Sequence, residues 1–172
     1  MNPLLLKERL TDVLEVWKRD GLPPRYELEN DARELVDWRR AQGIEGLWEQ
    51  PPLMLTATLD DGLGTGLKII HSYAEVAGIK IVPLGMFQLP ETIIDECSKQ
   101  LPDLLGLTVL QFSSEDALKQ ISSNLPAKTQ LIVGGSSIFQ AEPDLAERAG
   151  VHFVAENVAA FLQFLLDLGG VN

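Results

Sequence analysis

The sequence has few of the residues from which disulfides and metal sites are built. It holds one cysteine, Cys97, and two histidines, His71 and His152, in 172 residues. A single cysteine forms neither an internal disulfide nor a cysteine-based zinc site, so the fold needs no oxidising compartment. No apolar stretch approaches the roughly 18 residues that span a bilayer, and the apolar run at residues 4–6 is too short for a signal peptide. We therefore expect a soluble, cytoplasmic protein.

Positive charge is scarce as well. Lysine and arginine total 14 against 25 aspartates and glutamates, which gives a formal net charge of −11. A phosphate backbone would be repelled, so neither a nucleic acid nor an anionic membrane surface is expected as a partner. Hydrophobic residues make up 45% of the chain and charged residues 23%, a composition that is typical of globular domains and excludes disorder or coiled coil for the whole chain.

Two amphipathic helices are predicted near the start of the chain, over residues 4–19 and 27–42. Apolar residues recur there at helical spacing, and Gly21 to Pro24 separates the two patterns. All three tryptophans lie in the first 50 residues and are interpreted as packing residues: Trp17, Trp38 and Trp48. We predict an N-terminal helical hairpin over residues 1–50, followed by an α/β domain over residues 51–172.

The second part of the chain alternates short apolar runs with helical patterns. Runs without inward and outward alternation are typical of parallel strands that are covered on both faces. We predict a flavodoxin-like, doubly wound five-stranded parallel sheet in the order 2-1-3-4-5, whose ligands would bind at the carboxyl ends of the strands. The predicted strands are 53–59, 79–83, 104–110, 130–133 and 151–154, and the predicted helices are 65–77, 90–100, 114–124, 142–149 and 157–168.

Three of the predicted strands end in short polar or glycine-rich segments. The first is followed by Asp60 and the loop Asp61-Gly62-Leu63-Gly64-Thr65-Gly66, the third ends in Thr108-Val109-Leu110, and the fourth ends in Gly134-Gly135. Glycines let backbone amides approach a ligand, and a helix N-terminus favours anionic or polar groups. Each segment alone is equally typical of an ordinary turn.

Together these segments resemble the cobalamin (vitamin B12)-binding domain family of mutases, methionine synthase and corrinoid methyl carriers. The family pattern Asp-x-His-x-x-Gly, Ser-x-Leu and Gly-Gly is similar to the segments that begin at Asp61, Thr108 and Gly134. The resemblance covers about residues 53–168. It implies a cobalamin site formed by Asp61, Gly62, Leu63, Gly64, Thr65, Gly66, Thr108, Leu110, Gly134 and Gly135.

The resemblance fails at the residue that carries the family's chemistry. Leu63 stands where the family has a histidine beneath cobalt, and leucine has no lone pair to donate. Asp61, whose family role is to orient that histidine, then has either no such task or a structural role in capping the loop. Thr108 keeps a hydroxyl for the nucleotide tail of the cofactor, and the two glycines leave room for that tail. His152 is expected at the wrong end of the last strand, and neither a metal ligand nor a catalytic residue is predicted.

Rival interpretations of the same fold match fewer residues. A receiver domain needs an aspartate at the end of the third strand, where Thr108 to Leu110 stand, and a dinucleotide site needs an acid after the second strand. A flavin site could use Phe87 and Phe112 as ring contacts.

Two functions remain open. The chain is either a cobalamin module that lacks the histidine ligand and presents the cofactor to a partner enzyme or methyltransferase, or a regulatory or protein-interaction module that has lost the cofactor. The N-terminal hairpin would cap the site, pack beside the sheet, or complete a helical bundle in a homodimer.

Overall fold

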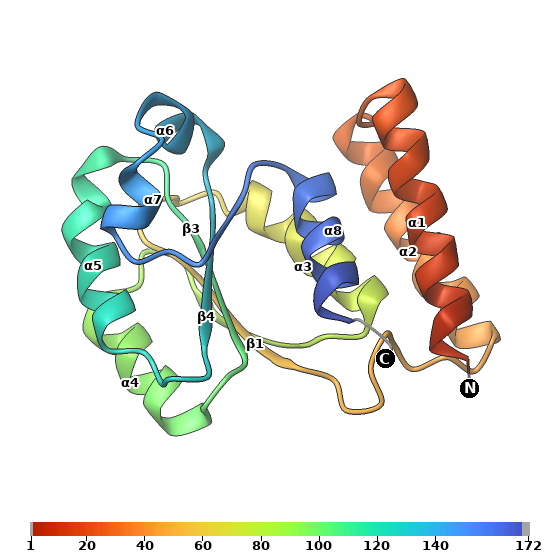
Figure 1. Cartoon of the computed structure of the whole chain (residues 1–172), viewed down its shortest axis with the longest axis horizontal. Coiled ribbons are helices and arrows are strands. Elements are labelled where there is room, and N and C mark those ends of the chain that lie inside the picture. Colours follow the sequence, from red (N-terminus) through yellow and green to blue (C-terminus); the bar gives the residue numbers. More distant parts are fainter. Residues whose placement is uncertain (1, 170–172) are drawn as a thin grey trace. The chain divides into compact units, whose positions relative to one another are not determined.

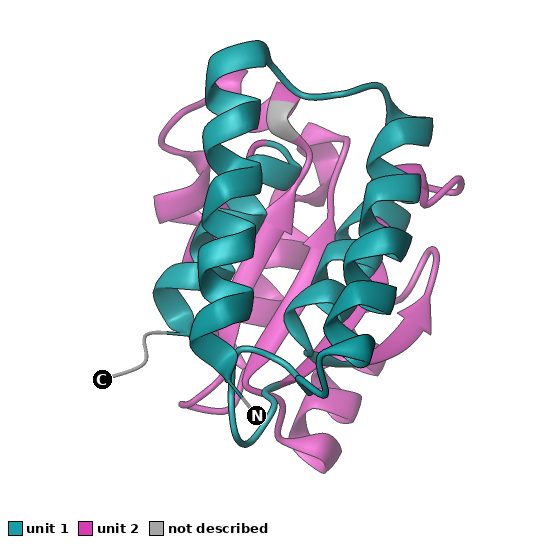
Figure 2. Cartoon of the chain, turned by 90° about the vertical axis from the view of Figure 1, so that its right-hand side faces the viewer, with its two compact units in different colours: residues 1–52, 68–80, 157–172 teal, residues 53–67, 81–156 magenta. Residues whose placement is uncertain are grey.

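The computed structural model describes residues 2–169. The chain divides into two compact units (Figure 2), of which unit 1 comprises residues 1–52, 68–80 and 157–172, and unit 2 comprises residues 53–67 and 81–156. The predicted division at residue 50 instead separates the first helices from all that follows, and it stays a prediction. Among the helices of residues 2–169, none has both the length and the apolar composition that crossing a membrane requires.

A five-stranded parallel sheet has the predicted strand order, β2-β1-β3-β4-β5. Its strands are β1 (Leu53–Thr58), β2 (Lys80–Gly85), β3 (Leu104–Thr108), β4 (Gln130–Gly134) and β5 (Phe153–Ala155). The flavodoxin-like fold predicted from the sequence is confirmed. Every residue of β3 and all but the first of β1 are buried, as the uninterrupted apolar runs indicated.

The core of unit 2 lies between the sheet and the helices that follow β2, β3 and β4. These are α4 (Pro90–Gln100), α5 (Glu115–Ser123), α6 (Ser136–Ala141) and α7 (Leu145–Arg148). In Figure 1, α4 and α5 lie together beside β3 and β4. Their apolar faces pack on strand residues in one cluster that includes Leu55, Ile93, Cys97, Leu107, Leu118, Ile121 and Val133. Cys97 is fully buried there, and burial raises the pKa of its thiol to about 11.

The prediction of a helix over residues 142–149 is wrong in its extent. The chain instead forms α6 directly after β4 and then the short helix α7, which begins at Leu145. Pro143 explains the break, because the residue before a proline is disfavoured in the helical region. Glu142 accordingly has φ −127° and ψ 85°.

Every strand begins or ends one or two residues from its predicted bounds, and at two of these ends another group takes the backbone hydrogen bonds. β3 ends at Thr108 because the N–H groups of Leu110 and Gln111 donate to the Asp60 carboxylate. β5 begins at Phe153 because Val151 N–H donates to the carbonyl of Ala146, closing the end of α7.

Unit 1 contains α1 (Pro3–Asp20), α2 (Arg25–Ala41), α8 (Val158–Leu168) and most of α3 (Thr65–Ala77). The ring of Trp17 on α1 meets that of Tyr73 on α3 edge to face, with 5.3 Å between centroids. The Tyr73 hydroxyl donates to the carbonyl of Leu28 on α2 at 3.0 Å, and burial raises the pKa of this buried phenol. The predicted helical hairpin therefore packs on α3, and α1 also contacts α8.

Candidate functional site

The three sequence segments predicted to form a site meet in one row of the sheet. Thr58 pairs with Thr108, Thr108 with Gly134, and Gly134 with Ala155, across β1, β3, β4 and β5. This row is the last at the carboxyl edge. In open α/β sheets, this edge is where ligands bind.

Asp60 fastens the loop after β1 to the loop after β3. Its carboxylate accepts hydrogen bonds from Leu110 N at 2.7 Å, Gln111 N at 2.9 Å and Ser114 Oγ at 2.7 Å. Sequence reasoning did not include Asp60 among the site residues, since its partners lie about 50 residues away. The clamp sets the position of the segment that carries Leu110.

Asp61 is directed into its own loop. Its Oδ1 accepts from Leu63 N at 2.8 Å and Gly64 N at 3.2 Å, and its carbonyl accepts from Thr58 Oγ1 at 2.5 Å. The residue is buried, whereas Leu63 is 83% exposed. The carboxylate therefore has the loop-capping role that was one of its two interpretations, and the side chain at position 63 is free to reach a ligand.

The two glycines after β4 differ in their surroundings. A β-carbon on Gly135 would lie 1.7 Å from the carbonyl oxygen of Val109, and the φ of +115° at Gly135 favours glycine in any case. A β-carbon on Gly134 would meet only Ala155 O, at 4.0 Å. Gly135 is thus explained by the close approach of two backbones, while the space at Gly134 is open.

Two other predicted positions offer space or a polar group, Gly66 and Thr108. A β-carbon on Gly66, in the first turn of α3, would have no neighbour within 4 Å. The Thr108 hydroxyl takes part in none of the hydrogen bonds found among residues 2–169. Thr108 and Gly134 lie side by side in the sheet, with a hydroxyl on the first and open space at the second. We call this pair of residues the cradle.

The loop after β2 contributes residues that the motif did not include. Phe87 has a φ of +51°, which is rare for a bulky residue, and its N–H donates to Thr58 Oγ1 at 3.0 Å. Its ring lies over Gly62, where a β-carbon would come within 2.6 Å of it. Gln88 N–H donates to the carbonyl of Thr58 at 2.9 Å, so the loop is attached to the end of β1 twice. The unusually apolar composition of this loop is the signal that could have revealed it.

Exposed apolar side chains gather on the loops at this edge. We call this set the apolar rim, and it consists of Leu63, Met86, Phe87, Leu89, Leu110 and Phe112. Each is at least 47% exposed, which is costly in water unless something covers them. A rim of this kind suits the apolar face of a large flat ligand.

Within residues 2–169, neither histidine belongs to the loops at this edge. His152 precedes β5 at the amino edge, where its Nδ1 accepts from Leu131 N at 2.8 Å. His71 lies on α3, half-buried, and burial lowers the pKa of its imidazole. Residues 2–169 contain no group of three or more histidine, cysteine, aspartate or glutamate side chains that could hold a metal ion.

No family model matches the sequence. The solved structures that are similar to the chain include the following three, and at their low identities the likeness shows the fold. A cobalamin-binding protein from Desulfitobacterium hafniense DCB-2 has a TM-score of 0.79 and 17% identity, and the match covers 98% of this chain and 82% of that one. The monomethylamine corrinoid protein of Methanosarcina barkeri has a TM-score of 0.60 and 19% identity, and the match covers 95% of this chain and 80% of that one. The methanol:cobalamin methyltransferase complex of the same organism has a TM-score of 0.65 and 14% identity, and the match covers 95% of this chain and 64% of that one.

Proposed function

We propose that the chain is a cobalamin-binding module that lacks the histidine lower ligand. The observation that carries the proposal is the row Thr58, Thr108 and Gly134, which brings the three family-like segments to one edge of the sheet. Three structures of this fold are cobalamin-binding or corrinoid proteins or a cobalamin methyltransferase complex, which supports the same ligand class.

The residues present fit most of the cofactor. The cradle at Thr108 and Gly134 has the open space and the hydroxyl that a nucleotide tail would use, and Gly66 adds room on the loop after β1. The apolar rim would cover one face of the corrin. Bound cobalamin would supply a cobalt centre that carries or transfers an alkyl group.

One part of the family pattern does not fit. Leu63 cannot ligate cobalt, and Asp61 already accepts two backbone hydrogen bonds within its loop. The histidine-ligated mode is therefore not proposed. The loop after β1 would line the site without ligating cobalt. Its residues there are Asp61, Gly62, Leu63, Gly64 and Thr65.

The proposed role is to present the cofactor to a partner. Acting on a substrate would require groups that this chain was not predicted to hold, so a partner enzyme or methyltransferase subunit would supply them. The likeness to the methanol:cobalamin methyltransferase complex favours a methyltransferase. A homodimer through the N-terminal helices is a second proposal for assembly.

Retention of the cofactor tests the proposal directly. Purified protein is incubated with cobalamin and desalted, and the visible spectrum of the protein fraction is recorded. We expect the wild type to retain cobalamin and Gly134→Val to lose it, because the added side chain fills the open space at the cradle. Gln130→Val is the matched control, since it changes the exposed opposite end of the same strand.

The competing function makes the opposite prediction. If the module has lost its cofactor and acts in regulation or protein interaction, the wild type, Gly134→Val and Gln130→Val will all emerge colourless. The self-contained hydrogen bonds of Asp61 are the observation that favours this alternative. Gly135 variants are unsuitable for the test, because a side chain there would collide with the Val109 backbone.

A further inference from the structure

We propose that the thioether of Met86 is this chain's donor to the cobalt of a bound corrinoid. The inference rests on the proposed cobalamin binding and adds to it a ligand that the family pattern does not contain. It starts from the question of which lone pairs the loops at the carboxyl edge leave free.

The two carboxylates of the loop after β1 and the Thr58 hydroxyl before it are engaged. Both oxygens of Asp60 accept hydrogen bonds from the loop after β3. Asp61 is buried and caps its own loop, and the Thr58 hydroxyl is buried between Asp61 O and Phe87 N. None of these groups can turn toward a ligand without breaking the contacts that shape the loop.

Met86 differs from these oxygen groups because it lies on the loop after β2 and carries a thioether sulfur. Its Sδ would lie 3.3 Å from a β-carbon on Gly64, so the sulfur sits against the residue next to Leu63. The side chain is 49% exposed, so part of it is open to solvent. The position that the family gives to an imidazole is thus occupied by leucine, and a thioether lies beside it.

The backbone holds Met86 at this place while the side chain can adjust. The next two residues, Phe87 and Gln88, both donate backbone hydrogen bonds to Thr58 at the end of β1. Methionine has three rotatable side-chain bonds, so its sulfur can move while its Cα stays fixed. This combination suits a weak ligand that engages when the cofactor arrives.

The coordination step requires no oxidation or proton transfer. Toward bound cobalt, the Met86 sulfur would offer a lone pair in place of the one from water or from the cofactor's own base. Thioethers are soft ligands. A thioether does not titrate near neutral pH, so coordination should not change between about pH 5 and 8, where an imidazole would become protonated.

Isotope labelling gives a direct test. The full-length protein is produced with selenomethionine enriched in the magnetic isotope of selenium, loaded with cobalamin and reduced to Co(II). We expect hyperfine coupling to selenium in the electron paramagnetic resonance spectrum, and its loss in Met86→Leu. Met54 is the internal control, because it is buried in β1 and keeps its label in that variant.

Two further measurements complete the design. Met86→Leu should weaken cobalamin binding by roughly threefold to tenfold, as expected for loss of one weak ligand. Met86→His should replace selenium coupling with nitrogen coupling and make the spectrum pH-dependent. Circular dichroism of each variant verifies the fold, which an exposed loop substitution should leave unchanged.

The outcomes separate this inference from the function beneath it. If wild-type protein retains cobalamin but shows no selenium coupling, and Met86→Leu has the same spectrum and affinity, Met86 is not a ligand and the binding function stands. If the wild type retains no cobalamin, the binding function fails, and the Met86 assignment is overturned with it.

Discussion

At the scale of single residues, position 63 distinguishes this chain from the histidine-ligated pattern. Leu63 is exposed and its backbone N–H is held by Asp61, so the path of the loop does not depend on the leucine side chain. A substitution there should therefore change ligand chemistry without changing the fold.

We predict that Leu63→His restores a nitrogen ligand. The imidazole would compete with Met86, tighten cobalamin binding by about tenfold, and add nitrogen coupling to the Co(II) resonance spectrum. The measurement is an absorbance titration followed by electron paramagnetic resonance. Leu63→Phe supplies a ring without a donor and should do neither; equal affinity of the two variants would contradict the prediction.

We predict that Asp60→Ala destabilises the protein more than its partial exposure suggests. Three donors lose one acceptor group, although water can replace part of the loss, so the free energy of unfolding should fall by about 1–2 kcal/mol. Urea denaturation measures it. Asp95→Ala, which breaks an exposed ion pair with Lys99 on α4, should change stability by less than about 0.5 kcal/mol.

The placement of the motif residues at one edge was predictable because parallel strands end at a common edge. Their role toward a ligand stays a prediction. The contribution of Asp60 was not predictable, since its three partners belong to a segment about 50 residues away. Met86 was not predicted for a related reason, and Phe87 was considered only as a contact of a flavin: only the fold shows that the loop after β2 reaches Gly62 and Gly64.

At the scale of elements, Arg39 connects three segments of unit 1. Its Nη1 donates to the carbonyls of Ile44, at 2.8 Å, and Glu45, and its Nη2 donates to the carbonyl of Glu75 on α3 at 3.3 Å. The guanidinium is buried, and burial lowers its pKa from the ordinary value. A buried cation thus donates to three carbonyls, of which that of Glu75 also accepts from Gly78 N.

Replacing Arg39 should therefore be severe. We predict that Arg39→Met lowers the free energy of unfolding by about 3 kcal/mol, because buried carbonyl groups lose a charged donor. Arg40→Met removes the neighbouring arginine, whose ion pair with Glu75 is exposed, and should cost less than about 1 kcal/mol. Similar losses in the two variants, measured by urea denaturation, would contradict the special role of Arg39.

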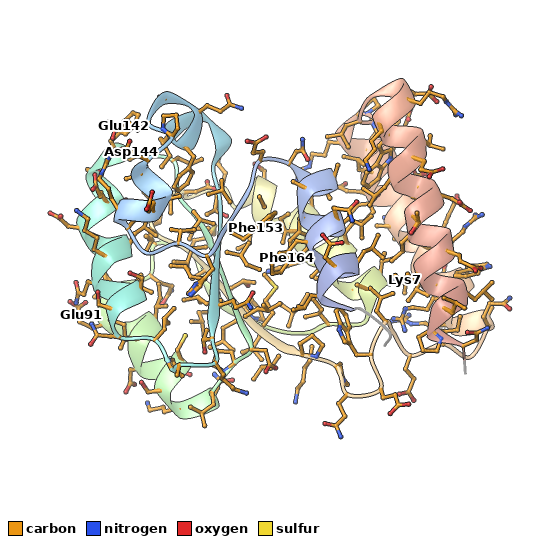
Figure 3. All side chains as sticks on the ribbon, viewed as in Figure 1. Lys7, Glu91, Glu142, Asp144, Phe153 and Phe164 are labelled. Atoms are coloured by element: carbon orange, nitrogen blue, oxygen red, sulfur yellow. The ribbon has the colours of Figure 1, made fainter. Side chains whose placement is uncertain are left out.

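A charged cluster joins α5 to α7 on the surface of unit 2. Arg148 contacts Glu115 at 3.2 Å, Glu142 at 2.7 Å and Asp144 at 2.6 Å, and Lys119 contacts Glu115 at 2.9 Å. Figure 3 labels Glu142 and Asp144, which lie close together beside α7. The hydrogen bond from Arg148, followed by that from Lys119, lowers the pKa of Glu115 to about 2.

This pKa predicts a pH dependence of stability. Because the folded-state pKa of Glu115 lies below its ordinary value of 4.5, the stabilisation is present above that value and is lost as the pH falls toward 2. Glu115→Gln should therefore lose stability less steeply than the wild type in this window. Urea midpoints across the acidic range measure the slopes. Glu147→Gln, at a residue that forms no ion pair within the described part of the chain, should keep the wild-type slope.

Helix and strand order was predictable because the apolar runs and helical patterns alternate clearly. The short helices α6 and α7 were not separated in the prediction, because four to six residues carry too little periodicity to define a helix. Pro143 marked the break, yet its effect on Glu142 outweighed the apolar spacing that suggested one helix. The end of β3 was misplaced because the Asp60 carboxylate accepts the backbone hydrogen bonds of Leu110 and Gln111, which a longer strand would have used for pairing.

At the scale of the whole molecule, the two compact units are interleaved in the sequence. Unit 1 contains residues 1–52, 68–80 and 157–172, whereas the proposed cobalamin site belongs to unit 2. All three tryptophans lie within the first segment of unit 1. Tryptophan fluorescence therefore reports unfolding of unit 1, while ligand binding adds free energy to unit 2.

Cobalamin should raise the unfolding midpoint of both units together. A ligand present at a hundred times its dissociation constant adds about 2.7 kcal/mol to the stability of the folded state, which corresponds to roughly 5–10 °C in Tm for a chain of this size. The chain passes between the units four times. Unfolding one unit therefore frees the ends of segments that belong to the other, and we expect one cooperative transition. Far-UV circular dichroism and the wavelength of tryptophan emission should then shift by the same amount when cobalamin is added. Gly134→Val should remove the shift from both signals. A shift in circular dichroism alone would show that the units unfold independently, and no shift in either signal would favour the module that has lost its cofactor.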